Sequence, residues 1–167
     1  MNVSIGEHKV GTHEYMLMAA KMFLGRYWPL LALPVVVCVG LAAWNTNFLY
    51  VAAMVAFLVL PMAQLLVFYK YTLYKEVSFS ILLKRLTLTD EGVEINYVSE
   101  NEENPARPSE RLPWERFACV TPSKSHILLI FRQPKFCFLA IPYSAFGNPA
   151  DLREAMNLIT SHIEYRG

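Results

Sequence analysis

The stretch Leu41–Ala53, LAAWNTNFLYVAA, decides the fold, because it joins two long apolar runs through three small polar residues. The run at residues 27–44 reads YWPLLALPVVVCVGLAAW, and the run at residues 48–69 reads FLYVAAMVAFLVLPMAQLLVFY. No Lys, Arg, Asp, Glu or His occurs between Tyr27 and Tyr69. The stretch therefore joins either two parts of a buried core or two membrane spans.

The lengths of the two runs favour membrane spans. At about 1.5 Å per residue, helices over residues 27–44 and 48–69 reach roughly 27 and 33 Å, close to the roughly 30 Å of a bilayer core. One helix over both runs would be too long, so the chain has to turn, and Asn45-Thr46-Asn47 suits a turn because Asn side chains bond their own backbone. The alternative is a soluble helical hairpin buried on all sides, for which the rest of the chain offers little cover.

The residues flanking the runs predict the orientation. Amphipathic rings gather at headgroup depth, and Tyr27, Trp28, Trp44 and Tyr69 stand at the ends of the runs. Basic residues flank the outer ends of the pair, whereas the Asn45–Asn47 loop has none; they are Lys9, Lys21, Arg26, Lys70, Lys75, Lys84 and Arg85. Since basic flanks stay on the cytoplasmic side, we expect both termini in the cytoplasm and the hairpin in a lipid bilayer.

Composition limits the possible functions. Apolar residues make up 54% of the chain and charged residues 17%, and the formal net charge of +1 gives no basic surplus for a nucleic-acid partner. Cys38, Cys119 and Cys137 have no CxxC spacing and are expected to be buried free thiols. The common hydrolase, nucleotide-binding and zinc motifs are absent from the sequence. We therefore expect no catalytic residues, no metal and no cofactor.

Three regions are expected. Residues 1–26 form an N-terminal segment whose residues 14–24, EYMLMAAKMFL, predict a short amphipathic helix. Residues 27–69 form the two-helix hairpin. Residues 70–167 form a cytoplasmic domain.

The last region has the pattern of a small antiparallel β-domain. Alternation in residues 80–97 predicts a hairpin that turns at Asp90-Glu91-Gly92, and three further strands follow in RLPWERFACVTPS, HILLIFR and KFCFLAIP. Asn148 and Pro149 predict the start of a closing amphipathic helix. The fold class is therefore α+β: a helical hairpin, then about five strands in a curved sheet or partial barrel closed by a C-terminal helix. The polar residues 100–110 predict a long loop, whose acidic cluster Glu100, Glu102 and Glu103 is expected to be solvated.

Three motifs carry a resemblance to a known family. They are Leu112-Pro113-Trp114-Glu115-Arg116-Phe117, the strand Ile127–Ile130, and the block Ile141-Pro142-Tyr143-Ser144-Ala145-Phe146 before the closing helix. With the hairpin before them, they resemble the YcxB-like membrane proteins of bacteria, whose cytoplasmic part is similar to pleckstrin-homology-like (PH-like) domains. The resemblance implies this architecture in the bacterial inner membrane, and it implies no particular activity.

Six residues are candidates for structural or interface roles. Trp114 is expected to anchor the small core, Pro142 to end a strand, and Phe146 to staple the sheet to the helix. In the hairpin, Gly40 and Ala43 could allow close helix approach, so a homodimer is expected, and Gln64 could make one side-chain hydrogen bond.

The function hypothesis is a membrane-anchored, non-enzymatic module. Its β-domain would recruit a protein partner of unknown identity or sense the inner leaflet. Two alternatives remain: an immunity protein that protects the inner membrane against a toxin, and an accessory subunit of an envelope or transport complex.

Overall fold

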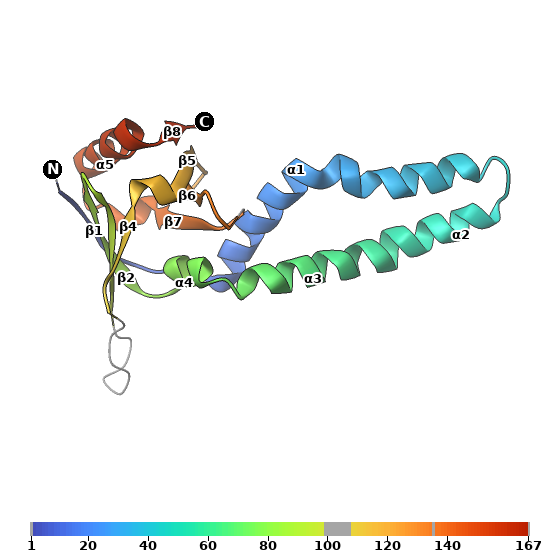
Figure 1. Cartoon of the computed structure of the whole chain (residues 1–167), viewed down its shortest axis with the longest axis horizontal. Helices are drawn as coiled ribbons and strands as arrows, with labels where there is room; N and C mark the ends of the chain where they lie inside the picture. Colours follow the sequence, from blue (N-terminus) through green and yellow to red (C-terminus); the bar gives the residue numbers. More distant parts are fainter. Residues whose placement is uncertain (1, 99–107, 135, 167) are drawn as a thin grey trace. The chain divides into compact units, whose positions relative to one another are not determined.

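The chain divides into two compact units (Figure 1). In this computed structural model, residues 2–98, 108–134 and 136–166 are described. The hairpin comprises Leu17–Leu73, and the β-domain comprises Met1–Met16 together with Tyr74–Gly167. The hairpin is therefore inserted in the sequence of the β-domain, after its first strand.

The hairpin consists of two helical arms joined near Asn45. The first arm is α1 (Thr12–Leu41), which contains Pro29 and Pro34. The second arm runs through α2 (Asn47–Met54), the π-helical segment η1 (Val55–Val59) and α3 (Leu60–Thr72). Two stretches, Thr12–Leu41 and Asn47–Leu66, are long and apolar enough to cross a membrane.

The turn between the arms has the predicted chemistry. The backbone N–H of Asn47 donates to Oδ1 of Asn45 at 3.0 Å, which is a local side-chain turn. Thr46 precedes α2 without a side-chain cap. The turn expected at Asn45–Asn47 is thus confirmed.

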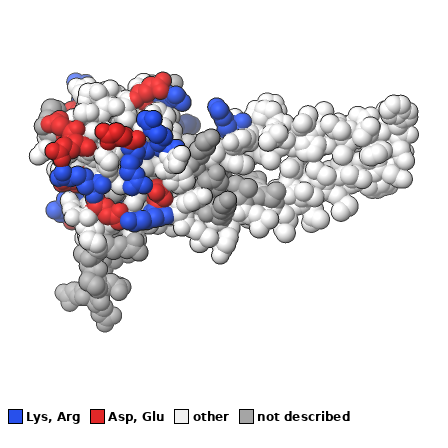
Figure 2. Space-filling model, viewed as in Figure 1, with Lys and Arg blue, Asp and Glu red and all other residues white. Residues whose placement is uncertain are grey.

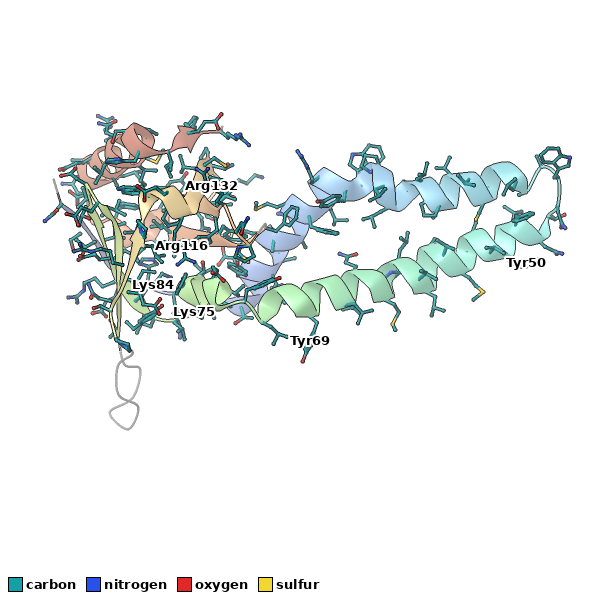
Figure 3. The ribbon with its side chains drawn as sticks, viewed as in Figure 1. Tyr50, Tyr69, Lys75, Lys84, Arg116 and Arg132 are labelled. Atoms are coloured by element: carbon teal, nitrogen blue, oxygen red, sulfur yellow. The ribbon has the colours of Figure 1, made fainter. Side chains whose placement is uncertain are left out.

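The hairpin exposes apolar side chains. In the most apolar 18-residue window of each stretch, 0% and 6% of the residues are buried. Tyr50 and Tyr69, labelled in Figure 3, are 74% and 68% exposed. On the face shown in Figure 2, charged side chains gather over the β-domain, whereas the outer part of the hairpin carries none. A buried core hairpin, the soluble alternative, does not describe this surface.

The N-terminal segment differs from the expected separate region with a short helix. Residues Val3–His8 form strand β1, and the helix that was expected over residues 14–24 is the beginning of the continuous α1. Val3 and Ile5 are buried while Ser4 and Gly6 are exposed, so period-two alternation signals this strand. No break follows residue 24: the helix continues past Pro29 and Pro34 to Leu41.

The first sheet has the order β1-β2-β3-β4, and all of its neighbours are antiparallel. The predicted turn at Asp90-Glu91 joins β2 to β3, where Leu88 pairs with Val93. Besides β1, the first sheet contains β2 (Lys84–Thr89), β3 (Gly92–Tyr97) and β4 (Glu110–Pro113). The loop predicted at residues 100–110, with Glu100, Glu102 and Glu103, lies largely outside the described residues.

The second sheet has the order β7-β6-β5-β8, in which only the β5–β8 pair is parallel. Its strands are β5 (Phe117–Pro122), β6 (His126–Phe131), β7 (Phe138–Pro142) and β8 (Glu164–Tyr165). The sequence predicts about five strands in a curved sheet or partial barrel, whereas the structure has two four-stranded sheets. The reason is that the 3₁₀ turn η2 (Trp114–Arg116) divides the expected strand RLPWERFACVTPS between the sheets, while residues 3–8 and 164–165 add a strand to each.

Two helices and a 3₁₀ turn complete the β-domain. α4 (Lys75–Ile81) packs against β7, η3 (Tyr143–Ala145) lies beside β1, and α5 (Pro149–His162) contacts β1 and β2. The predicted cap of α5 is confirmed, because Oδ1 of Asn148 accepts from the N–H of Ala150 at 3.3 Å. The core between these elements includes fully buried Ile5, Leu86, Ile95, Phe117, Leu129, Phe138 and Ile159. The fold class is α+β.

Candidate functional site

A pocket of about 600 Å³ opens on the β-domain beside Trp114. Four separate parts of the chain form it: the β2–β3 turn, η2 with the start of β5, the residue after β6, and the end of α5 with β8. Its lining residues are Asp90, Glu91, Trp114, Glu115, Phe117, Ala118, Arg132, His162, Ile163 and Glu164. We call this the Trp114 pocket.

Trp114 is fixed at the wall of this pocket. It is 5% exposed, and its indole Nε1 donates to the carbonyl oxygen of Thr89 at 3.0 Å. The imidazole of His162 stacks on it with ring centroids 5.3 Å apart and planes 4° apart, and the ring of Phe117 lies at 6.1 Å. These contacts support the anchoring role expected of Trp114 and also make it a rigid pocket wall.

The charges of the Trp114 pocket are of both signs. Glu91 pairs with Arg111 at 2.5 Å, and Glu164 pairs with Arg166 at 3.0 Å. Glu115 and Arg132 are exposed and form no ion pair with another described residue; Arg132 is labelled in Figure 3. One carboxylate and one guanidinium are therefore available to a ligand or partner at the pocket.

Two other predicted residues of the β-domain lie elsewhere. Pro142 ends β7, as expected, and is half-buried. Phe146 is half-buried two residues before Asn148, and its N–H donates to the carbonyl oxygen of Tyr143 at 3.2 Å. Neither residue lines the Trp114 pocket.

The three candidates in the hairpin do not form a common site. Gly40 and Ala43 are exposed, and a Cβ at Gly40 would meet nothing within 4 Å. Gln64 is half-buried, and its side chain makes no hydrogen bond with another described residue, so the expected side-chain bond stays a prediction. Ala52 is the buried hydrophobic residue among the described positions of α2.

A second polar group lies inside the β-domain, and sequence reasoning missed it. Lys84 is 0% exposed, and its Nζ donates to the carbonyl oxygen of Ser80 at 2.9 Å. Burial lowers the pKa of this lysine to about 7. Lys84 was interpreted as a basic residue flanking the membrane, which its burial contradicts; Figure 3 labels it within the β-domain. The signal was its period-two spacing with Leu86 and Leu88, which puts all three on one face.

His8 faces the same interior because β1 contains a bulge. Ile5 pairs with Leu86 and His8 pairs with Lys84, so three steps on β1 match two steps on β2. The imidazole Nδ1 lies 2.8 Å from the carbonyl oxygen of Gly6 and must donate to it, which leaves Nε2 as an acceptor. Nε2 is buried and has no hydrogen-bond partner among the described residues. Burial is the main reason why the pKa of His8 is lowered to about 4.

Ser80 links these groups to the edge of the second sheet. Its hydroxyl donates to the carbonyl oxygen of Phe138 at 2.8 Å and accepts from the N–H of Ala140 at 3.1 Å. Its own carbonyl oxygen accepts from the N–H of Val10 at 3.2 Å as well as from Lys84. Ser80 thereby covers the free edge of β7 and holds the chain just before α1.

The first turn of α1 is held on the same side of the β-domain. The ring of Tyr15 stacks on Phe138 with centroids 4.4 Å apart. Glu14 Oε1 lies 3.7 Å from Nδ1 of His126, which is also 2.8 Å from Oγ of Ser125. We call His8, Ser80, Lys84 and His126 the buried polar cluster.

The described residues contain no group of three or more His, Cys, Asp or Glu side chains that could hold a metal ion. The Trp114 pocket offers a concave contact surface, and the buried polar cluster contains titratable side chains with lowered pKa values, His8 and Lys84. No family model matches this sequence, and neither a curated protein nor a solved structure is significantly similar to it.

Proposed function

We propose that this protein is a membrane-anchored, non-enzymatic binding module of the bacterial inner membrane, with both termini and the β-domain in the cytoplasm. The observation that carries the proposal is the exposure of the hairpin, whose most apolar windows are 0% and 6% buried. Exposed apolar surface of this extent needs a cover, and a bilayer provides it over the uncharged apolar part of both arms. The basic residues that flank the hairpin favour the cytoplasmic orientation.

The binding role is assigned to the Trp114 pocket. Aromatic and arginine side chains contribute much of the energy of protein interfaces, and here Trp114 and Arg132 line one concave surface. The ring of Trp114 is already held by His162 and Thr89, so a partner loses little entropy in ordering it. A protein partner recruited to the membrane is the proposed ligand.

Cysteine labelling tests the membrane topology. In a Cys38→Ala background, Thr46→Cys should react with a membrane-impermeant maleimide in intact bacterial cells. Lys124→Cys, at the exposed β5–β6 turn, should react only after the membrane is opened. The native Cys119 and Cys137 are buried and should stay silent. Labelling at Lys124 and protection at Thr46 in intact cells would contradict the orientation.

Charge inversion tests the binding role separately. The double variant Glu115→Arg, Arg132→Glu changes two exposed pocket side chains that have no ion-pair partner to lose among the described residues. After cross-linking in cells and purification in mild detergent, at least one protein should be depleted about tenfold relative to wild type. The control Lys124→Glu, away from the pocket, should retain it. If the inverted pocket keeps every partner, or the purified protein turns over a metabolite, the binding proposal is wrong.

A further inference from the structure

The bulge in β1 decides which side chain lies opposite Lys84. Without the extra residue, continuing the register from Ile5 and Leu86 would place Glu7 opposite Lys84. With it, Glu7 is on the outer face and pairs with Arg85 at 2.6 Å, while His8 faces inward. The bulge therefore gives Lys84 a neutral imidazole as its cross-strand neighbour in place of a carboxylate.

Among the residues that the structure describes, no carboxylate of another element forms an ion pair with Lys84. His8 lies across from it on β1 and Tyr97 on β3. Ser80 of α4 accepts its hydrogen bond, and His126 of β6 is the next basic group near His8. The carboxylate of Glu14 is directed to His126, and that of Glu76 to Arg116 at 3.0 Å. Cys137, just before β7, is buried, which raises its pKa to about 12 and keeps it neutral.

An ammonium group in this position is costly. A buried charge without a paired opposite charge loses its hydration, and one carbonyl oxygen replaces only part of it. The neutral amine fits the site better and keeps the bond to Ser80. This explains why burial depresses the pKa of Lys84 so far from the usual value of about 10.4 for lysine.

Lys84 also lies at a junction of the chain. The carbonyl oxygen that it contacts is the one that accepts from Val10, which connects β1 to α1. β1 is an edge strand, so β2 is its single partner in the sheet. A disturbance at Lys84 thus acts directly on the strand pairing that holds the N-terminal strand in the sheet.

We propose that Lys84 and His8 form a proton-sensitive latch: when Lys84 takes up a proton, β1 and the segment that follows it loosen from the β-domain. All of these groups lie in the β-domain, so the latch does not depend on the proposed function. The sign follows from linkage. The open state exposes Lys84 and binds its proton up to about pH 10.4, whereas the closed state binds it only below about pH 7. Opening therefore becomes rarer as the pH rises from about 7 towards 10.

Hydrogen exchange of the full-length protein in detergent tests the latch. After correction for intrinsic exchange rates, the protection of the peptide covering residues 2–10 should rise between pH 7 and 9, by up to about tenfold per pH unit. A peptide covering β6 serves as an internal reference and should change less. Protection of residues 2–10 that does not depend on pH in this range would overturn the proposal.

Matched variants identify the proton site. Lys84→Met removes the titratable amine and should abolish the pH dependence of protection in the peptide covering residues 2–10. Lys124→Met, at an exposed turn, should leave that pH dependence intact. His8→Glu places a carboxylate opposite Lys84 and should also flatten the dependence, because the lysine is then charged in both states. If protection of residues 2–10 in Lys84→Met rises with pH as steeply as in the wild type, the latch proposal is wrong. If that variant does not fold, the wild-type profile and His8→Glu decide.

Discussion

The indole of Trp114 and the imidazole of His162 lie parallel, 5.3 Å apart, and join the start of the second sheet to the last turn of α5. Trp114 also donates to Thr89 at the end of β2, so one side chain connects both sheets and the closing helix. Three segments that are distant in sequence depend on it for their relative position.

Loss of this connection should weaken the β-domain as a whole. Trp114→Phe removes the bond to Thr89 and part of the stack, and should lower the free energy of unfolding by about 1–3 kcal/mol. His162→Ala removes one face of the stack from an exposed position and should cost about 0.5–1 kcal/mol. Denaturant titration of the full chain followed by circular dichroism measures both. If neither variant lowers the free energy of unfolding, the stack of Trp114 and His162 does not stabilise the domain.

Gly92 should be irreplaceable at the β2–β3 turn. Its φ is +156°, and a Cβ there would lie 2.2 Å from the carbonyl oxygen of Leu112 on β4. Because that atom belongs to the backbone, Gly92→Ala should destabilise the β-domain by more than about 2 kcal/mol. Gly147→Ala is the matched control, since a Cβ at Gly147 meets nothing within 4 Å. Thermal melting in detergent compares the two, and an equal effect would contradict the argument.

Ser80 should contribute more to the stability of the β-domain than its small side chain suggests. Ser80→Ala leaves the buried N–H of Ala140 and carbonyl oxygen of Phe138 without the hydroxyl, at a cost of about 2–4 kcal/mol. Ser78→Ala removes an exposed local bond to the carbonyl oxygen of Lys75 and should have little effect. Hydrogen exchange at Ala140 gives a local readout: protection there should fall in Ser80→Ala and persist in Ser78→Ala.

His8 should make the protein sensitive to acid. The folded protein holds His8 neutral down to about pH 4, whereas the unfolded chain binds a proton near pH 6.5. Stability should therefore fall as the pH drops from about 6.5 to about 4, by at most about 3 kcal/mol. Denaturant titrations at several pH values measure the slope of the free energy of unfolding against pH. His8→Leu should reduce it, and His13→Leu, at an exposed site, should not.

The hairpin is expected to self-associate through small residues. Gly40 and Ala43 are exposed, and the space beside Gly40 is open, so Leu at both positions fits the single chain. Gly40→Leu with Ala43→Leu should weaken a homodimer in detergent, measured by mass photometry and by cross-linking in membranes. Val59→Leu on the other arm is the control. A monomer in both settings would end this prediction.

Local signals in the sequence predicted local structure well. The Asn45 turn, the Asp90-Glu91 turn and the Asn148 cap each depend on a few adjacent residues, and each is present. The strand at residues 126–131 follows from its own composition. Such elements can be predicted from neighbouring residues alone.

Features that depend on distant pairing were missed. The bulge in β1 exists only because β2 fixes the register on either side of it, and the burial of Lys84 follows from that pairing. The Trp114 pocket needs four separate parts of the chain, so Trp114 could be singled out but His162 and Arg132 could not. The π-helical segment Val55–Val59 likewise has no signal in its apolar sequence.

The insertion of the hairpin between β1 and α4 has a consequence for biosynthesis. The ribosome releases β1 first, then the entire hairpin, and only later β2, on which β1 pairs. During translation the N-terminal strand therefore has no partner until the apolar hairpin and then β2 have been synthesised. A fragment that starts at Tyr74 would lack β1, expose the edge of β2 and tend to aggregate. Expression of a soluble β-domain should therefore require residues 2–16 to be supplied as well, either in trans or through a short linker to Tyr74.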